Sequence, residues 1–212
     1  MKKPVLLSLA LACAATFAYR PADALEAVAS TEASVEAHQL AQAAANAHDS
    51  QGLPFAVVDK KKARLFIFGA DGTLQGTSPV LLGLAQGDDS APGIGERKLS
   101  DIRPEERTTP AGRFVSEPGT NLQGEDIVWV DYGAAVSMHR VRTANKSERR
   151  LERLASANAA DHRISYGCIN VPAAFYDTYV KPAFGSASGV IYVLPEQQPA
   201  HAYFNFLPRG NE

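Results

Sequence analysis

Apolar and polar positions along most of this chain follow the short, alternating or wholly apolar runs that are typical of β-strands. We predict strands at residues 55–58, 64–68, 77–82, 127–130, 134–138 and 190–194. Asp71-Gly72 separates the second and third runs, and an Asp-Gly pair favours a tight hairpin turn. Residues 84–108 are rich in glycine, proline and charge, which predicts a long surface loop.

Two helices are predicted after the fifth strand. Asn145 followed by Glu148 resembles a capping box and predicts a helix over residues 147–156. A second helix is expected to begin at Pro172, because proline is favoured at the first helical position, and to end before Pro182. The pattern therefore predicts a mainly β domain with helices packed on it.

The N-terminus has the three parts of a cleavable signal peptide. Met1-Lys2-Lys3 is basic, residues 5–17 are mostly apolar, and Ala22-Asp23-Ala24 is an A-x-A cleavage pattern. We therefore predict a signal peptide over residues 1–24 and export to the periplasm. Cys13 would suggest a lipoprotein, but Ala10-Leu11-Ala12 before it fits a lipidation site poorly.

The remaining chain divides by composition. Residues 25–50 are rich in alanine, which predicts a loosely attached helical lead-in. We predict that residues 51–195 form a single domain and that residues 196–212 form a C-terminal tail. Cleavage after Ala24 moves the formal charge from −2 to −4, which argues against a nucleic-acid partner. No other run has the ~20 apolar residues that a membrane helix needs, so no integral membrane segment is expected after cleavage.

Cys168 is the candidate nucleophile. It would be the only cysteine after signal cleavage, and it lies in the polar segment Ser165-Tyr166-Gly167-Cys168-Ile169-Asn170-Val171. An unpaired cysteine in an exported protein indicates a reactive thiol, and a nearby imidazole or a following helix N-terminus favours the thiolate. The alternative is a buried and inert cysteine, which the glycine beside Cys168 and the polar surroundings oppose.

Three segments together resemble the L,D-transpeptidase (YkuD-type) catalytic domain family. They are the cysteine segment with upstream His139, the opening pair 55–59 and 64–68, and Thr109-Pro110-Ala111-Gly112-Arg113-Phe114, which is similar to the family's T-P-x-G-x-F. The resemblance covers roughly residues 54–194 and implies a mainly β, sandwich- or barrel-like fold with two or three helices packed on it. Two departures stand out: Tyr166 replaces the usual histidine, and an inserted basic segment lengthens the spacing from His139 to Ser165.

The resemblance implies His139 as the general base. His162, three residues before Ser165, is the rival, although it has no matching position in the family's motif. The backbone N–H groups of Gly167 and Cys168 are the expected oxyanion donors. Tyr166 either donates its hydroxyl to the oxyanion or only packs.

Ser165 and Asn170 are expected to support the loop, Asn170 through its amide or as a helix cap. The segment 140–163 carries seven basic residues against three acidic ones, a pattern typical of a solvated helix face. Arg140, next to His139, is the exception that we expect to bind a substrate carboxylate.

The implied activity is L,D-transpeptidation of peptidoglycan stem peptides through a thioester. An envelope protein is one of the acyl acceptors that this reaction allows. The alternatives are an L,D-carboxypeptidase or amidase on the same scaffold, and a catalytically degenerate protein that only binds cell wall. A papain-like protease is disfavoured because its cysteine precedes its histidine. The spacing of histidines and cysteines gives no metal signature, no phosphate-binding glycine loop is present, and no cofactor is expected.

Overall fold

The computed structural model describes residues 34–209, so the predicted signal peptide lies outside the described residues. The strands are β1 (Phe55–Asp59), β2 (Arg64–Phe68), β3 (Leu74–Pro79), β4 (Leu82–Gly83), β5 (Gly112–Thr120), β6 (Asp126–Asp131), β7 (Val136–Arg140), β8 (Arg163–Ser165), β9 (Ile169–Val171) and β10 (Gly189–Val193). The α-helices are α2 (Val35–Asn46), α3 (Arg150–Leu154), α4 (Ala173–Phe175) and α5 (Lys181–Phe184). Within residues 34–209, none of the helices is both long and apolar enough to cross a membrane.

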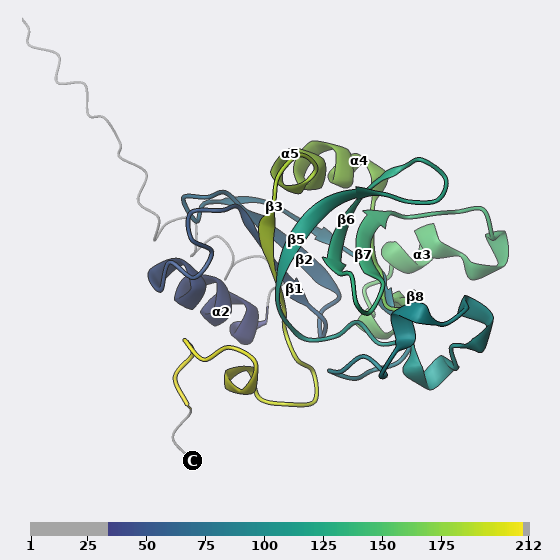
Figure 1. Cartoon of the computed structure of the whole chain (residues 1–212), viewed down its shortest axis with the longest axis horizontal. Helices are drawn as coiled ribbons and strands as arrows, with labels where there is room; N and C mark the ends of the chain where they lie inside the picture. Colours follow the sequence, from purple (N-terminus) through teal and green to yellow (C-terminus); the bar gives the residue numbers. More distant parts are fainter. Residues whose placement is uncertain (1–33, 210–212) are drawn as a thin grey trace, which may run out of the picture.

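Eight of the strands form one nearly closed sheet. Their order is β3-β2-β1-β10-β5-β6-β7-β9, and β4 and β8 form a separate pair. The two ends of the large sheet meet where Leu81, just after β3, exchanges two backbone hydrogen bonds of 2.9 and 2.8 Å with Asn170 of β9. The prediction of a mainly β, barrel-like fold with a few packed helices is therefore confirmed (Figure 1).

Strands β1, β2 and β10 are buried on both faces. Alternate side chains point into the barrel, where they meet the helical segment from α4 to α5: Ala56, Val58, Leu65, Ile67, Ile191 and Val193. The intervening side chains point outward and are covered by α2 and the C-terminal segment: Phe55, Val57, Phe66, Phe68, Val190, Tyr192 and Leu194. Burial on both faces explains why these strands read as almost continuous apolar runs.

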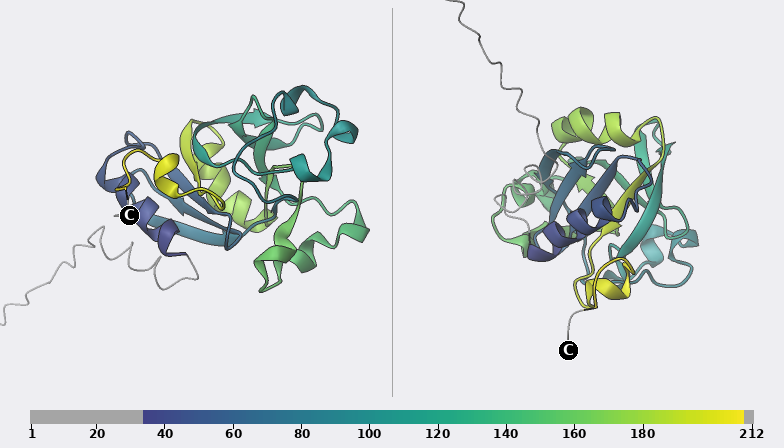
Figure 2. Two further views of the ribbon diagram at one scale, coloured as in Figure 1. Left: turned by 90° about the horizontal axis from the view of Figure 1, so that it is seen from below. Right: turned by 90° about the vertical axis from the view of Figure 1, so that its left-hand side faces the viewer.

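Helix α2 belongs to the packed fold. The described part of the predicted lead-in, residues 34–50, thus contains a helix as expected, but the expectation of a loose attachment is wrong for it. It begins after Ser34, whose hydroxyl accepts a hydrogen bond of 3.1 Å from the Ala37 N–H. It lies across the outer face of the strands, with Leu40 fully buried (Figure 2). The alanines that weakened the sequence signal include Ala37, Ala41 and Ala44, which are buried in the outer core with Leu40. The predicted tail also contributes, because Phe204 is buried in the same outer core.

The two helices that were predicted after the strand at residues 134–138, now β7, differ in detail from the prediction. The first is shorter: a 3-10 turn (Lys146–Glu148) leads into α3, with Arg149 between them at a positive φ. The second continues through Pro182, because a π-helical turn (Tyr176–Val180) joins α4 to α5, and such turns accommodate a break in regular helical bonding.

The sequence pattern missed β5, β8 and β9, and its predicted strand over residues 77–82 merged the end of β3 with the start of β4. β5 contains Pro118 and Gly119 and exposes about half of its side chains, so its apolar periodicity is weak. β8 and β9 have three residues each, too few to show a period.

Packing of α2 predicts unequal costs for two truncations in the same helix. Leu40→Ala should lower the free energy of unfolding by about 2–5 kcal/mol, because it leaves a cavity in the outer core. Val35→Ala, at a position 73% exposed, should change it by less than about 0.5 kcal/mol. Urea unfolding followed by circular dichroism measures both. Equal, small effects would mean that α2 does not contribute to the fold.

Candidate active site

The parallel pairing of β7 with β9 assembles the site. Met138 lies opposite Ile169, and His139 lies opposite Asn170. Since side chains alternate between the two faces of a strand, Met138 and Ile169 enter the core while His139 and Asn170 face outward. The apolar residues thus anchor the two strands that present the polar ones.

Ser137 precedes Met138 and Cys168 precedes Ile169, so the same register places Ser137 next to Cys168, just before β9 begins. The Ser137 hydroxyl oxygen lies 3.6 Å from Cys168 Sγ, and Cys168 is half-buried. Both residues and His139 line one cleft of about 520 Å³. The structure therefore brings together the predicted nucleophile and the predicted base.

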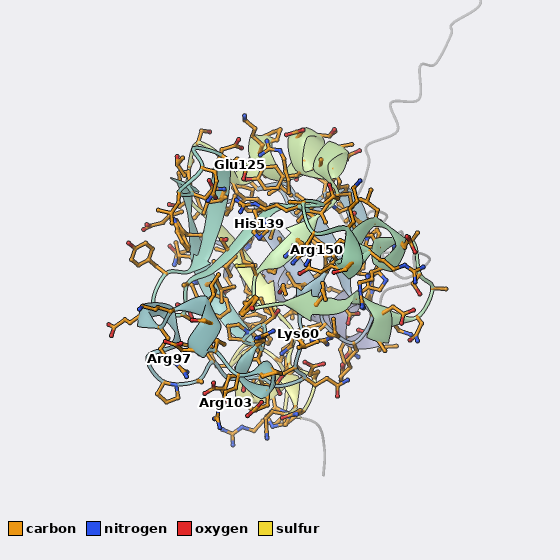
Figure 3. All side chains as sticks on the ribbon, turned by 90° about the vertical axis from the view of Figure 1, so that its right-hand side faces the viewer. Lys60, Arg97, Arg103, Glu125, His139 and Arg150 are labelled. Atoms are coloured by element: carbon orange, nitrogen blue, oxygen red, sulfur yellow. The ribbon has the colours of Figure 1, made fainter. Side chains whose placement is uncertain are left out.

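Three segments far apart in the sequence form the walls of this cleft. Leu99 contributes from the long loop, the β5–β6 hairpin contributes its tip, and the connection after β7 contributes the third wall. Figure 3 looks onto this side of the molecule, with His139 and Arg150 near the middle of the view. The remaining lining residues are Asn121, Leu122, Gln123, Ile127, Trp129, Arg142, Ala144, Asn145, Glu148, Ser165, Tyr166 and Asn170.

His139 is held in the tautomer that a general base needs. Its Nδ1 lies 2.7 Å from the Arg140 carbonyl oxygen, which can only accept a hydrogen bond. Nδ1 therefore carries the proton, and Nε2 keeps its lone pair. Burial alone would raise the pKa of the Cys168 thiol, but hydrogen bonding and charge from His139, followed by Ser137, hold that pKa below its ordinary value.

The loop that carries Cys168 is closed by its own hydrogen bonds. Ser165 Oγ donates to the Cys168 carbonyl at 2.6 Å and accepts from the Gly167 N–H at 3.1 Å. Asn170 Nδ2 donates to the same carbonyl at 3.1 Å. Ser165 and Asn170 thus lie where loop support was expected, and Asn170 acts through its amide rather than as a helix cap.

The expectation for Gly167 needs correction. Its N–H is already donated to Ser165, so of the two predicted backbone oxyanion donors only the Cys168 N–H lacks a side-chain acceptor within residues 34–209. Gly167 has a φ of 128°, and a Cβ there would lie 2.7 Å from the Thr108 carbonyl oxygen. A glycine is therefore required for backbone geometry. β9 also separates Cys168 from the following helix, so no helix N-terminus adjoins the thiol.

A buried threonine, which the sequence analysis gave no role, supports this loop from behind. Thr109 Oγ1 donates to the Gly167 carbonyl at 2.8 Å and accepts from the Gly83 N–H at 2.9 Å. The Thr109 carbonyl in turn accepts a hydrogen bond of 3.0 Å from Lys60 Nζ, which is buried and paired with Asp88 at 2.9 Å. The position of Thr109 in the T-P-x-G-x-F segment was the available signal.

Tyr166 faces the cleft and packs against the long loop. The guanidinium carbon of Arg107 lies 4.0 Å from the centre of the Tyr166 ring, and Arg107 also donates to the Ile102 carbonyl. The Tyr166 hydroxyl has no hydrogen-bond partner within residues 34–209, so the described contacts are those of a packing aromatic.

Arg140 is not placed to bind substrate, contrary to the prediction. Its guanidinium is bonded to Asp126 and Asp177 and lies 4.3 Å from the centre of the Tyr176 ring. It is not among the residues that line the cleft. Burial alone would lower the pKa of Arg140, but hydrogen bonds to Asp177 and Asp126 raise it above its ordinary value. Arg140 therefore joins β7 to β6 and to the π-helical turn, while its carbonyl orients His139.

His162, the rival base, lies outside the cleft. It is buried, with Nδ1 3.0 Å from the Val80 carbonyl and Nε2 3.0 Å from the Ser156 carbonyl. Both ring nitrogens are thus occupied by backbone groups, which gives His162 a structural environment. Residues 34–209 contain no group of three or more His, Cys, Asp or Glu side chains that could hold a metal ion.

Comparison with known proteins gives limited similarity. No family model matches the chain, and no curated protein matches it. Among solved structures, it is similar to the NMR structure of the catalytic domain from E. faecium L,D-transpeptidase, with 18% sequence identity and a TM-score of 0.34. That similarity covers 66% of this chain and 95% of the other.

The contact between Ser137 and Cys168 predicts a shift in thiol reactivity. In Ser137→Ala the hydroxyl that can donate to the thiolate is lost, so the midpoint of the pH dependence of alkylation by iodoacetamide should move to higher pH. Ser137→Thr keeps a hydroxyl and should stay close to the parent. An unchanged midpoint in Ser137→Ala would show that the hydroxyl does not stabilise the thiolate.

Proposed function

We propose that this protein is a periplasmic L,D-transpeptidase that acts on peptidoglycan stem peptides through a thioester on Cys168. The observation that carries the proposal is the pairing of Cys168 with a His139 tautomer whose Nε2 is free to take a proton, at the floor of an open cleft. The order of the three sequence segments that resemble this family supports the same reaction. The basic, apolar and A-x-A parts of residues 1–24 support export to the periplasm.

Acylation follows from the positions of these groups. His139 Nε2 takes the proton of the Cys168 thiol, and the thiolate attacks the carbonyl that joins the L-centre of a diamino acid to a terminal D-residue. The oxygen becomes negatively charged, and the Cys168 N–H donates a hydrogen bond to it. The C–N bond then breaks, His139 returns the proton to the leaving amine, and a thioester remains.

Deacylation uses the same two residues in reverse. An acceptor amine gives its proton to His139 and attacks the thioester, the C–S bond breaks, and the thiolate is restored. An amine from another stem gives a cross-link, a free D-amino acid gives an exchanged terminus, and a lysine gives an attached envelope protein. Water as the acceptor gives carboxypeptidase or amidase activity.

The lining of the cleft suits a peptide that carries both aliphatic segments and charges. Leu99, Leu122, Ile127 and Trp129 offer apolar surface along the cleft, whereas Arg142 and Arg150 offer cationic groups. Such a mixture of apolar surface with a few polar groups is typical of binding sites for small molecules and peptides.

Replacing the base should slow acylation without abolishing the fold. His139→Ala should lower the acylation rate by about 10²- to 10⁴-fold, because the thiol proton loses its acceptor. His201→Ala, an exposed histidine outside the cleft, is the matched control and should react like the parent. Single-turnover acylation by a disaccharide tetrapeptide measures both. A full rate in His139→Ala would exclude this residue as the base.

The reaction itself is tested by intact-mass measurement after incubation with a disaccharide tetrapeptide. We expect an adduct whose mass is that of the stem without its terminal D-residue, and an exchanged stem when a second D-amino acid is added. Cys168→Ala should form neither, because the thioester cannot form.

The other outcomes distinguish the alternatives. Hydrolysed stem without exchange would identify a carboxypeptidase. Retention of stem without any adduct or product, in the parent as in Cys168→Ala, would contradict the proposed enzyme and indicate a cell-wall-binding protein.

A further inference from the structure

Two arginines line the cleft that contains Cys168, and their surroundings differ. Arg142 reaches across to the β5–β6 hairpin, where it donates to Gln123 at 3.1 Å and to Glu125 at 2.6 Å. Its side chain is 43% exposed. Arg142 therefore joins two walls of the cleft at the solvent boundary, and Glu125 offsets its charge.

Arg150 lies deeper, with a side chain only 14% exposed. Its Nε forms an ion pair with Glu148, a carboxylate that also lines the cleft, and its Nη1 donates to the side-chain oxygen of Asn170. Its Nη2 has no hydrogen-bond partner within residues 34–209. Since a guanidinium carries five N–H donors, two contacts hold this group in place and leave donors for a ligand.

The position of Arg150 is tied directly to the nucleophile. The amide of Asn170 accepts from Arg150 on one side and donates to the Cys168 carbonyl at 3.1 Å on the other. One side chain thus separates the guanidinium from the backbone of the reacting residue. Arg150 and Cys168 also line the same cleft, so a ligand group on Arg150 would lie in the cleft that contains the nucleophile, and little side-chain entropy would be lost on binding.

We propose that Arg150 is the residue that binds a carboxylate of the donor stem, the peptide that supplies the acyl group. The inference rests on the proposed function and names the recognition element of that site. The carboxylate belongs to a residue that flanks the scissile bond, either the side chain of the diamino acid or the terminal D-residue. The basic segment inserted between His139 and Ser165 would then provide substrate specificity.

The test is a cycle that combines substitution of Arg150 with removal of the substrate's charge. Acylation kcat/KM is measured for the parent and for Arg150→Gln with three stems: the free stem, a stem amidated at the diamino acid carboxylate, and a stem amidated at its terminus. On the free stem we expect Arg150→Gln to lose about tenfold to a hundredfold, the usual range for a hydrogen bond to a charged group. On the stem whose amidation removes the carboxylate that Arg150 binds, the same substitution should have little effect on kcat/KM.

Arg149→Gln is the matched control. Arg149 is the neighbouring arginine, its side chain is 69% exposed, and it pairs with Glu152 rather than lining the cleft. It should discriminate between free and amidated stems as the parent does. Arg150→Lys keeps the charge without the planar fork and should recover part of the lost kcat/KM.

Alkylation of Cys168 by iodoacetamide, which carries no carboxylate, separates recognition from damage to the loop. We expect Arg150→Gln to be alkylated at the parent rate. Equal losses on free and amidated stems, or a loss of alkylation shared by Arg150→Gln and Arg150→Lys, would overturn the proposal and assign Arg150 a structural role. A parent enzyme that acylates free and amidated stems equally would also overturn it, whereas a parent that acylates none of them would instead contradict the proposed function.

Discussion

The parallel pairing of β7 with β9 is the constraint on which the site depends. It places Ser137 and His139 on the same face as Cys168 and Asn170, and it buries Met138 and Ile169 on the other. A parallel pair cannot be joined by a tight turn, so the chain must leave β7 and return to begin β9 in the same direction. Residues 141–168 make this return, and in doing so they form one wall of the cleft.

Asn170 contacts three parts of the structure: the other end of the sheet, the loop that carries Cys168, and Arg150 in the cleft. Its backbone pairs with Leu81 and brings the two ends of the sheet together. Its side chain holds the Cys168 carbonyl and accepts from Arg150. Closure of the barrel, the shape of the nucleophile loop and the position of a cleft arginine therefore depend on one residue. The polar face that β9 presents is stable because Ile169 and Val171 are fully buried behind it.

The nucleophile loop owes its shape to buried polar contacts rather than to apolar packing. Thr109 and Ser165 satisfy the loop's carbonyl and N–H groups, and Lys60 fixes the carbonyl of Thr109 from a buried ion pair. Such networks hold a backbone in one conformation when every member has a partner. This network therefore holds Cys168 close to Ser137 and His139.

Sequence alone determined the local elements and the candidate reactive residues. The apolar runs predicted β1, β2, β6 and β10, the Asp-Gly pair predicted the turn between β2 and β3, and Cys168 with the upstream His139 was predicted as the pair of nucleophile and base. These features are encoded within a few neighbouring residues, so a period or a motif reveals them.

Tertiary structure decided everything that depends on which segments meet. The sequence singled out Arg140, next to His139, and gave Arg150 no separate role, yet Arg140 pairs with Asp126 and Asp177 while Arg150 lines the cleft. The contact of Ser137 with Cys168, the hydrogen bonds of Thr109 and the burial of α2 were likewise not predicted, because they are contacts with residues distant in the chain. The sequence pattern indicates whether each residue prefers burial or exposure. Which residue it then contacts depends on how the strands and loops pair in three dimensions.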